Sequence, residues 1–194
     1  MRFLIFFLLI NNLIFTQSKN SIKNILINKE YDSESFFVGA TIGHDMLSKP
    51  SVTDLFLSEF TYLTPANSFK QTAIHPRPGV WNWKKYDDFI DFAEKNNLIL
   101  RIHGPVSPQA SKWAKNDNRT KEELLKNMED FFTELCIRLN DEKTVKWMDV
   151  VNETVLRSGD WFKEKPGDSA WENPWTQIGL NDDGFPIYLS LIHI

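Results

Sequence analysis

The chain contains few of the residues and motifs that would point to particular classes of protein. Its 194 residues include one cysteine, Cys136, so no disulfide can form within the chain. Cys136 follows Leu135 in an amphipathic stretch, and we expect a small buried residue rather than a nucleophile. The formal net charge is −4 at pH 7, which gives no reason to expect nucleic acid or an anionic membrane as a partner. No glycine-rich phosphate loop follows the first predicted strand, so a nucleotide-binding sheet is disfavoured, and we expect neither a cofactor nor a metal ion.

Long apolar runs are also scarce, and the one at the N-terminus is short. After a positively charged start, residues 3–15 are almost wholly apolar, and Thr16 and Ser18 place small residues where a signal peptidase reads them. A membrane anchor is the alternative, but the run is shorter than the roughly 18 to 20 residues that span a bilayer. We therefore predict a cleaved signal peptide over residues 1–18 and a leader over 19–35. The mature protein would be secreted and extracellular, without a membrane partner.

The rest of the chain alternates between strand-like and helix-like segments. Short apolar segments predict strands over residues 36–41, 60–64, 98–102 and 145–151. Apolar residues at helical spacing predict helices over residues 52–58, 83–96 and 122–139. The pattern of the last strand is typical of a strand buried on both faces. Four βα units in sequence imply parallel strands with helical crossovers, in either a doubly wound sheet or a (β/α)₈ barrel.

Polar and ionisable residues stand where three of these strands end. They are Asn67 and Lys70 after the second strand, Arg101 and His103 at the third, and Asn152 and Glu153 after the fourth. Each has an ordinary structural explanation: Glu153 can cap the following loop, His103 can be a hydrogen-bonded structural histidine, and Lys70 can be a solvated charge. In a barrel, however, all these positions lie on the one rim that carries active sites. The set as a whole therefore predicts an active site there.

A series of short motifs between residues 37 and 161 adds a family resemblance. It consists of Val38-Gly39-Ala40 on the first strand, Thr64, Asn67 and Lys70 at the second, Gly79 to Trp83 before a helix with Asp87, Phe92 and Ala93, Arg101 and His103 on the third strand, and Asp149 to Glu153 on the fourth. This series resembles glycoside hydrolase family 10, the secreted endo-β-1,4-xylanases, and the run from Asp149 to Glu153 is its most specific part. The resemblance implies an α/β fold, a (β/α)₈ TIM barrel of which this chain carries about the first four βα units.

The resemblance also implies a role for each matching residue. Glu153 would be the general acid/base, Asn152 would hold the 2-hydroxyl group of the sugar, and Asn67, Lys70 and His103 would bind sugar on the non-reducing side of the cleaved bond. The implied mechanism is retaining, with a nucleophilic glutamate on a later strand that is absent from this chain. The role of Glu153 is physically reasonable, because a glutamate protonates a leaving group near neutral pH only where its surroundings disfavour the anion.

The chain departs from the family pattern in three places. Ala66 stands where members carry a glutamate, so one hydrogen bond to sugar is missing. Residues 104–109, Gly-Pro-Val-Ser-Pro-Gln, replace the tryptophan and second histidine that usually follow His103. Met148 stands where a tryptophan usually precedes the aspartate of the fourth strand. These changes spare Glu153 but reshape the sugar subsites, so the residues define the reaction class better than the substrate.

Aromatic residues gather after Glu153 in a segment rich in glycine and proline. They are Trp161, Phe162, Trp171 and Trp175. Because flat rings stack on the C–H faces of pyranose rings, this segment is a candidate for binding the leaving-group sugars, and we choose Trp161 as a substrate-binding residue. The alternative is that these side chains pack on the rim as a lid.

The sequence therefore predicts that residues 36–188 are the N-terminal part of a glycoside hydrolase barrel. We expect retaining hydrolysis of β-1,4-glycosidic bonds in a plant-type or algal polysaccharide, with xylan as the expected substrate, by a protein that is monomeric when full length. A related β-glycanase with another backbone preference and a secreted, non-catalytic carbohydrate-binding protein are the alternatives. Residues 189–194 match a one-frame translation of a sequencing-library adapter, so we expect a non-native tail. An open half barrel without its nucleophile should be inactive alone.

Overall fold

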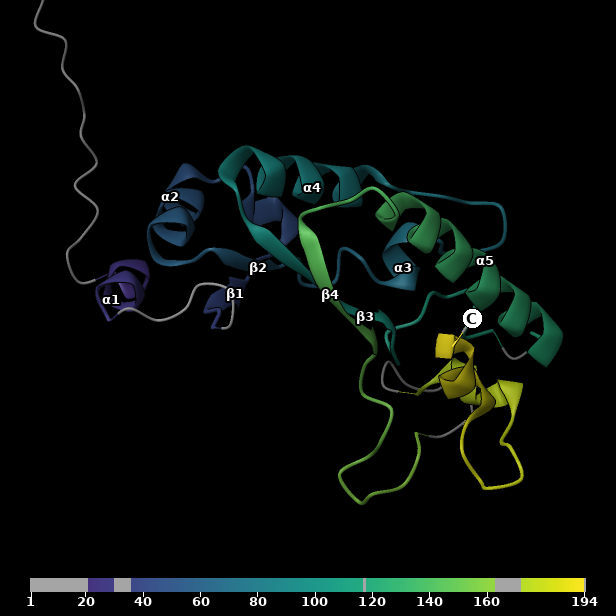
Figure 1. Ribbon diagram of the computed structural model, residues 1–194. Coiled ribbons are helices and arrows are strands. Elements are labelled where there is room, and N and C mark those ends of the chain that lie inside the picture. Colours follow the sequence, from purple (N-terminus) through teal and green to yellow (C-terminus); the bar gives the residue numbers. More distant parts are fainter. Residues whose placement is uncertain (1–20, 30–35, 117, 163–171, 194) are drawn as a thin grey trace, which may run out of the picture.

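The computed structural model describes most of the chain after the predicted signal peptide (Figure 1). The described residues are 21–29, 36–116, 118–162 and 172–193. The predicted signal peptide, 1–18, lies outside them, as does Trp171, and the predicted leader is described only over 21–29. No helix in the described part of the chain is long and apolar enough to cross a membrane.

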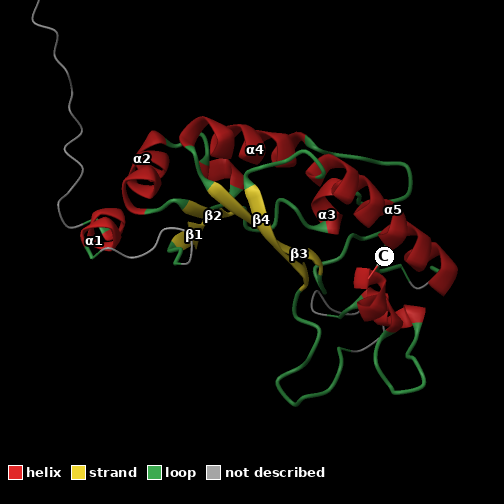
Figure 2. Ribbon diagram, in the orientation of Figure 1, coloured by secondary structure: helices red, strands yellow, loops and turns green. Residues whose placement is uncertain are grey.

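Four parallel strands form one sheet (Figure 2). Their spatial order is the sequence order, β1-β2-β3-β4. The strands are β1 (Gly39–Thr41), β2 (Tyr62–Thr64), β3 (Ile99–Val106) and β4 (Val145–Val151). The α-helices are α1 (Ile22–Asn28), α2 (Pro50–Glu59), α3 (Gln71–Ile74), α4 (Lys84–Asn96) and α5 (Lys121–Leu139). Short 3₁₀ helices are η1 (His44–Met46), η2 (Pro174–Ile178) and η3 (Ile187–His193). The parallel α/β arrangement and the four predicted strands are thus confirmed.

The main core lies between one face of the sheet and the helices α2, α4 and α5, which arch over it (Figure 1). Leu63, Leu100 and Ile102 point from the strands into this core, where they are fully buried with Phe89 and Phe131. Side chains alternate along a strand, so the residues between them point to the opposite face. In β3 this opposite face carries half-buried residues, Arg101 and His103 among them.

Helix α5 begins at a capping box and buries one stripe. The Thr120 hydroxyl accepts a hydrogen bond from the Glu123 N–H, and the Glu123 carboxylate accepts one from the Thr120 N–H. The stripe includes Phe131 and Leu135. Cys136 is exposed, so the prediction of a buried cysteine was wrong. A helix turns by about 100° per residue, which carries Cys136 away from the stripe that Leu135 occupies.

Two further details of the strands differ from prediction. Strand β4 is not buried on both faces, because it forms one edge of the described sheet and exposes Lys146 and Trp147. Strand β3 continues beyond the predicted end, Ile102, to Val106. Its pairing with β4 shifts register between His103 and Val106, where β3 has one extra residue. Such a bulge accommodates Pro105, whose ring nitrogen has no hydrogen to donate to the ladder.

A second, smaller core forms where the segment after β4 returns to α5. Trp175 of η2 and Tyr188 of η3 are buried there against Leu124 and Met128 of α5 and Val106 of β3. Figure 1 shows η2 and η3 beside α5. Trp175 is therefore a core residue and does not offer a free ring face. Leu189 also packs on this core; the non-native origin of residues 189–194 stays a prediction.

Candidate active site

The carboxyl ends of β2, β3 and β4 lie at the same edge of the sheet, because the three strands are parallel and adjacent. Asn67 and Lys70 follow β2, and Asn152 and Glu153 follow β4 directly. His103 lies within β3 rather than at its end, because the strand runs on to Val106, and this corrects the predicted position. His103 lies on the face of β3 opposite the main core.

The backbone is unusual near this edge at three places: after β2, within β3 and after β4. Ala66 has φ 37°, Gly104 has φ 53° and Glu153 has φ 53°, all in the left-handed region. Residues other than glycine occupy this region at a cost, and such positions cluster at functional sites. At Glu153 the turn follows the last residues of β4, and the residue is exposed at the edge of the sheet.

Lys70 is the most buried of the predicted site residues, with 2% of its surface exposed. Its ammonium group donates a hydrogen bond to Gln109 Oε1 at 2.9 Å. Burial lowers the pKa of Lys70, and the negative charge of Glu153 opposes that shift. Lys70 is therefore not a solvated loop charge. The part played by Gln109 was not predicted, since no sequence pattern indicates the partner of a buried lysine.

His103 belongs to a network of hydrogen bonds and ion pairs on the face of β3 and β4 opposite the main core. Asp149 Oδ2 lies 3.1 Å from His103 Nδ1, and Asp149 Oδ1 accepts hydrogen bonds from Arg101 Nη2 at 2.6 Å and Nε at 3.0 Å. Burial opposes ionisation of Asp149, but the hydrogen bonds from Arg101 and His103 outweigh it and lower the pKa of Asp149. The role of Asp149 was not predicted from the sequence. A signal was present, because a carboxylate within a strand needs a partner for its charge.

Asn152 and Asn67 differ in how firmly they are held. Asn152 is half-buried, and its backbone N–H donates to the carbonyl of Val106 at 2.9 Å, which extends the β3–β4 pairing beyond the strands. Asn67 is exposed, and its carbonyl accepts a hydrogen bond from the Lys70 N–H at 3.3 Å. The structure thus brings the two predicted amides to the same edge as Lys70 and Glu153.

Trp161 lies further along the chain, in the loops beyond β4. Its indole N–H donates to the carbonyl of Gly184 at 3.1 Å, and its ring meets the edge of the exposed Phe185 at a centroid distance of 5.7 Å. These contacts join the loop after Glu153 to the turn before η3. The described contacts of Trp161 therefore hold two loops together and do not link it to the other predicted site residues.

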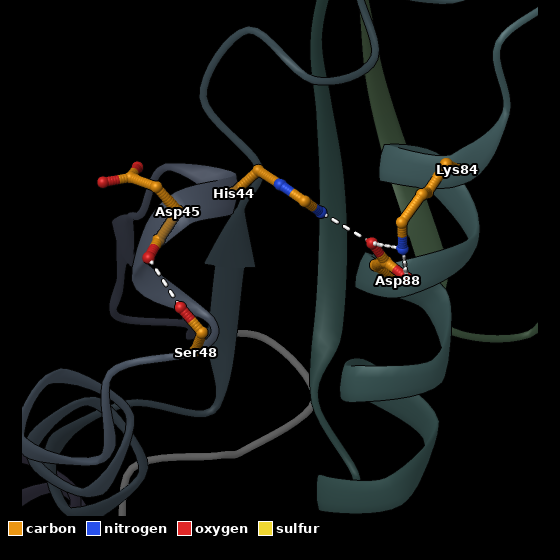
Figure 3. Close-up of polar contacts among 5 residues, drawn as sticks. All are labelled: His44, Asp45, Ser48, Lys84 and Asp88. Atoms are coloured by element: carbon orange, nitrogen blue, oxygen red, sulfur yellow. Dashed lines mark hydrogen bonds and ion pairs between the residues drawn. The ribbon is translucent and has the colours of Figure 1, made fainter.

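A pocket of about 400 Å³ lies beside the loop that follows β1. His44 Nε2 lies 2.7 Å from Asp88 Oδ2, and Lys84 contacts both oxygens of Asp88, so the loop is tied to α4 (Figure 3). The Ser48 hydroxyl donates to the carbonyl of Asp45 within the loop. The lining of this pocket includes none of the predicted site residues. Within the described ranges, no group of three or more His, Cys, Asp or Glu side chains could hold a metal ion.

Comparison with known proteins assigns this arrangement to a family. A sequence model of glycosyl hydrolase family 10 matches residues 27–180. The chain belongs to glycosyl hydrolase family 10. A β-1,4-xylanase of Dictyoglomus thermophilum is 31% identical over 151 residues, which are 77% of this chain and 39% of that protein. Endo-1,4-β-xylanase B of Thermotoga neapolitana is 32% identical over 128 residues, 64% of this chain and 36% of that protein.

Solved structures of family 10 members agree with the sheet. Xylanase 10B of Thermotoga petrophila, crystallised with xylobiose, matches with a TM-score of 0.62 at 28% identity, over 78% of this chain and 44% of that one. The fold is therefore the family's (β/α)₈ barrel, and the four parallel strands described here are part of it. The chain spans less than half the length of these family 10 relatives.

Proposed function

We propose that this chain supplies the acid/base half of a retaining glycoside hydrolase that cleaves β-1,4 bonds in xylan. The observation that carries the proposal is the position of Glu153, directly after β4, at an edge of the sheet that also holds Asn152 and the buried Lys70. Active sites of such barrels lie at this end of the strands. The xylanase names of the relatives support xylan as the substrate.

In the proposed reaction, Glu153 protonates the leaving-group oxygen and then activates water. A nucleophilic carboxylate on a later strand would lie about 5 to 5.5 Å away, as retaining glycosidases require. Lys70, Asn67 and His103 would bind hydroxyl groups on the non-reducing side, and Asn152 the 2-hydroxyl group. Trp161 would offer its ring to the leaving-group sugars.

The substrate-binding surface differs from the family pattern, and a β-glycanase with another backbone preference is the second candidate. Ala66 provides no carboxylate for sugar, and Gln109 occupies one hydrogen bond of Lys70. A sugar hydroxyl group that binds Lys70 must therefore share it with Gln109. Affinities for xylohexaose and cellohexaose, measured side by side, decide between the candidates.

We also propose that the protein is secreted after cleavage near Ser18. The support is the apolar run of residues 3–15, followed by small residues. N-terminal sequencing of protein recovered from the medium should begin after Ser18. Retention of residues 1–18 on the mature protein would contradict secretion by this route.

The catalytic part of the proposal is tested with Glu153→Gln in two preparations. The first is the chain itself, in which the variant should bind xylohexaose nearly as well as the wild type. The second joins residues 21–180 to the part of the Thermotoga petrophila xylanase that this chain does not cover. There, hydrolysis of xylan should fall by roughly 10²- to 10⁴-fold, because that is the contribution of general acid–base catalysis.

Glu94→Gln is the matched control, because Glu94 is an exposed glutamate on α4. It should change neither binding nor hydrolysis. Equal hydrolysis by the Glu153→Gln and wild-type proteins would remove Glu153 from its role. Binding of xylohexaose without hydrolysis in the joined wild-type protein would favour a non-catalytic carbohydrate-binding protein.

A further inference from the structure

Asp149 lies between two partners on the neighbouring strand, the guanidinium group of Arg101 and the ring of His103. In the β3–β4 register, Asp149 pairs directly with His103, and Arg101 lies two residues earlier on β3, on the same face. Each carboxylate oxygen of Asp149 has its own partner: Oδ1 takes the two N–H groups of Arg101, and Oδ2 faces His103 Nδ1. The carboxylate is thus held on one side and presented to the histidine on the other.

This contact decides which ring nitrogen of His103 carries the proton. An ionised carboxylate can only accept, so its contact with Nδ1 requires that Nδ1 bears the hydrogen. In the neutral ring, Nε2 is then left as an acceptor for a group outside the network. Arg101 supplies the charge that keeps Asp149 ionised, because its guanidinium group stays protonated.

Stability alone is a weak explanation for this network. The side chains of Arg101 and Asp149 are 44% and 27% exposed, and partly exposed ion pairs contribute little to folding. Arg101 and Asp149 also line a pocket of about 490 Å³ together with Tyr62 and Trp147, and His103 is not part of that lining. The His103 side chain is itself 36% exposed, so a carboxylate that orients its ring acts on whatever the ring binds.

We propose that Asp149 is a positioning residue of the proposed active site: it fixes the ring of His103 so that Nε2 accepts a hydrogen bond from a sugar hydroxyl group, and Arg101 holds Asp149 for this task. The proposal rests on the proposed function, because that function makes sugar the ligand of His103. Both carboxylate oxygens of Asp149 are engaged by Arg101 and His103, so the proposal gives Asp149 no sugar contact of its own. Its effect on sugar binding passes through His103.

The first test reads the tautomer of His103 directly, by ¹⁵N NMR of the imidazole nitrogens in the 194-residue chain at pH 8. The wild type should carry its proton on Nδ1. In Asp149→Asn the amide oxygen should stay with Arg101, which can only donate, so the amide N–H₂ group turns to His103. Nδ1 must then accept, and the proton moves to Nε2.

Asp87→Asn is the matched control for this test. Asp87 also pairs with an arginine, Arg138, at 2.8 Å, but on the surface of α4 and α5. The control should leave the His103 spectrum unchanged. A wild-type chain with its proton on Nε2 of His103 would overturn the proposal, and this measurement needs no variant to fold.

The second test is a double-mutant cycle on xylohexaose affinity, with the melting temperature measured for each variant. Asp149→Asn should weaken binding by up to roughly 10-fold in the wild-type background, the upper value of a hydrogen bond between neutral groups. In the His103→Ala background it should change binding by less than about twofold, because the residue through which it acts is gone. Equal losses in both backgrounds would show that Asp149 is merely structural and would overturn the proposal.

The two tests separate this proposal from the proposed function. If neither the wild type nor any variant binds xylohexaose, sugar binding is wrong, and with it the sugar-directed role of Asp149. The tautomer measurement would then still decide whether Asp149 orients His103. If the wild type binds xylohexaose but the cycle shows no coupling, the proposed function stands and the positioning role falls.

Discussion

Gly104 of β3 and Asn152 after β4 lie so close together that a Cβ atom added to Gly104 would be 2.5 Å from the Cβ of Asn152. Real Cβ atoms do not approach each other this closely, because packed atoms meet at about 3.5 to 4 Å. Gly104 also has φ 53° and lies at the register shift of the β3–β4 pair. The bulge and the missing side chain together let Asn152 take its place at the edge of the sheet.

Gly104→Ala should therefore lower both stability and sugar affinity. The positive φ and the contact with Asn152 together should cost about 2 to 3 kcal/mol of unfolding free energy, since a strained non-glycine backbone costs of order 1 to 3 kcal/mol. The control is Gly79→Ala, at φ 71° with nothing near the added Cβ. Urea unfolding and xylohexaose titration should show a smaller loss of stability and no loss of affinity in the control. Equal effects of the two variants would contradict a specific Gly104–Asn152 contact.

Lys70→Met should separate binding from stability. Methionine has similar length without the charge, and replacing a buried charge by an apolar group of similar size is often neutral or stabilising. We expect an unchanged or raised melting temperature and a loss of xylohexaose affinity. Lys112→Met, at an exposed lysine, should change neither. A Lys70→Met protein that melts lower but binds as well as the wild type would make Lys70 a structural residue.

Local patterns predicted the strands and the position of Glu153 well, because both depend on short stretches of sequence. The apolar, β-branched run 145–151 matches β4, and an amide and a carboxylate directly after it can only lie at its carboxyl end. Helix α5 was predicted over 122–139 and begins one residue earlier. These features depend on residue types within one element and on the rule that parallel strands end at the same edge.

Contacts between elements were not predictable in the same way. The bulge at Gly104 and Pro105 depends on the pairing partner β4, so β3 was predicted too short. Gln109 meets Lys70 across 39 positions of sequence, and no local pattern encodes that distance. The sequence made Trp175 a candidate for stacking on sugar, but η2 packs on α5 and Trp175 is buried there. The tertiary structure, rather than propensity, decides each of these cases.

Ala66→Glu should restore the sugar contact that the family pattern contains and this chain lacks. A new hydrogen bond is worth about 0.5 to 1.5 kcal/mol, so xylohexaose affinity should rise by about 2- to 10-fold. Ala66→Leu adds similar bulk at the same positive φ, but no hydrogen-bonding group. Ala66→Leu should change stability about as much as Ala66→Glu does, but it should not raise xylohexaose affinity. If isothermal titration finds no higher xylohexaose affinity for Ala66→Glu than for Ala66→Leu, position 66 does not face the sugar.

His75 gives the fold a pH dependence that is independent of the proposed active site. The ring is buried, with 1% of the residue exposed, and stacks on Trp81 at a centroid distance of 3.8 Å. Gln71 Nε2 donates to Asn127 Oδ1 at 3.0 Å, which turns the Asn127 amide nitrogen toward His75 Nδ1, 3.3 Å away. Nδ1 is therefore an acceptor, and a proton added there would remove that hydrogen bond.

Burial lowers the pKa of His75 from its ordinary value of 6.5, against the opposing effects of a hydrogen bond to the Asn127 backbone and of the carboxylates of Asp130 and Glu134. Below pH 6.5 the unfolded chain therefore binds a proton that the folded chain does not, so the unfolding free energy falls as the pH drops from 7 to 5, by at most about 1.4 kcal/mol per pH unit. Asp88 and Asp149, whose pKa values lie below 3.8, add acid sensitivity only at lower pH. In His75→Asn the side-chain oxygen can replace Nδ1 as the acceptor but does not titrate. Urea unfolding between pH 5 and 7 should therefore show a flatter profile for this variant, and identical profiles for the two proteins would mean that His75 does not titrate in this range.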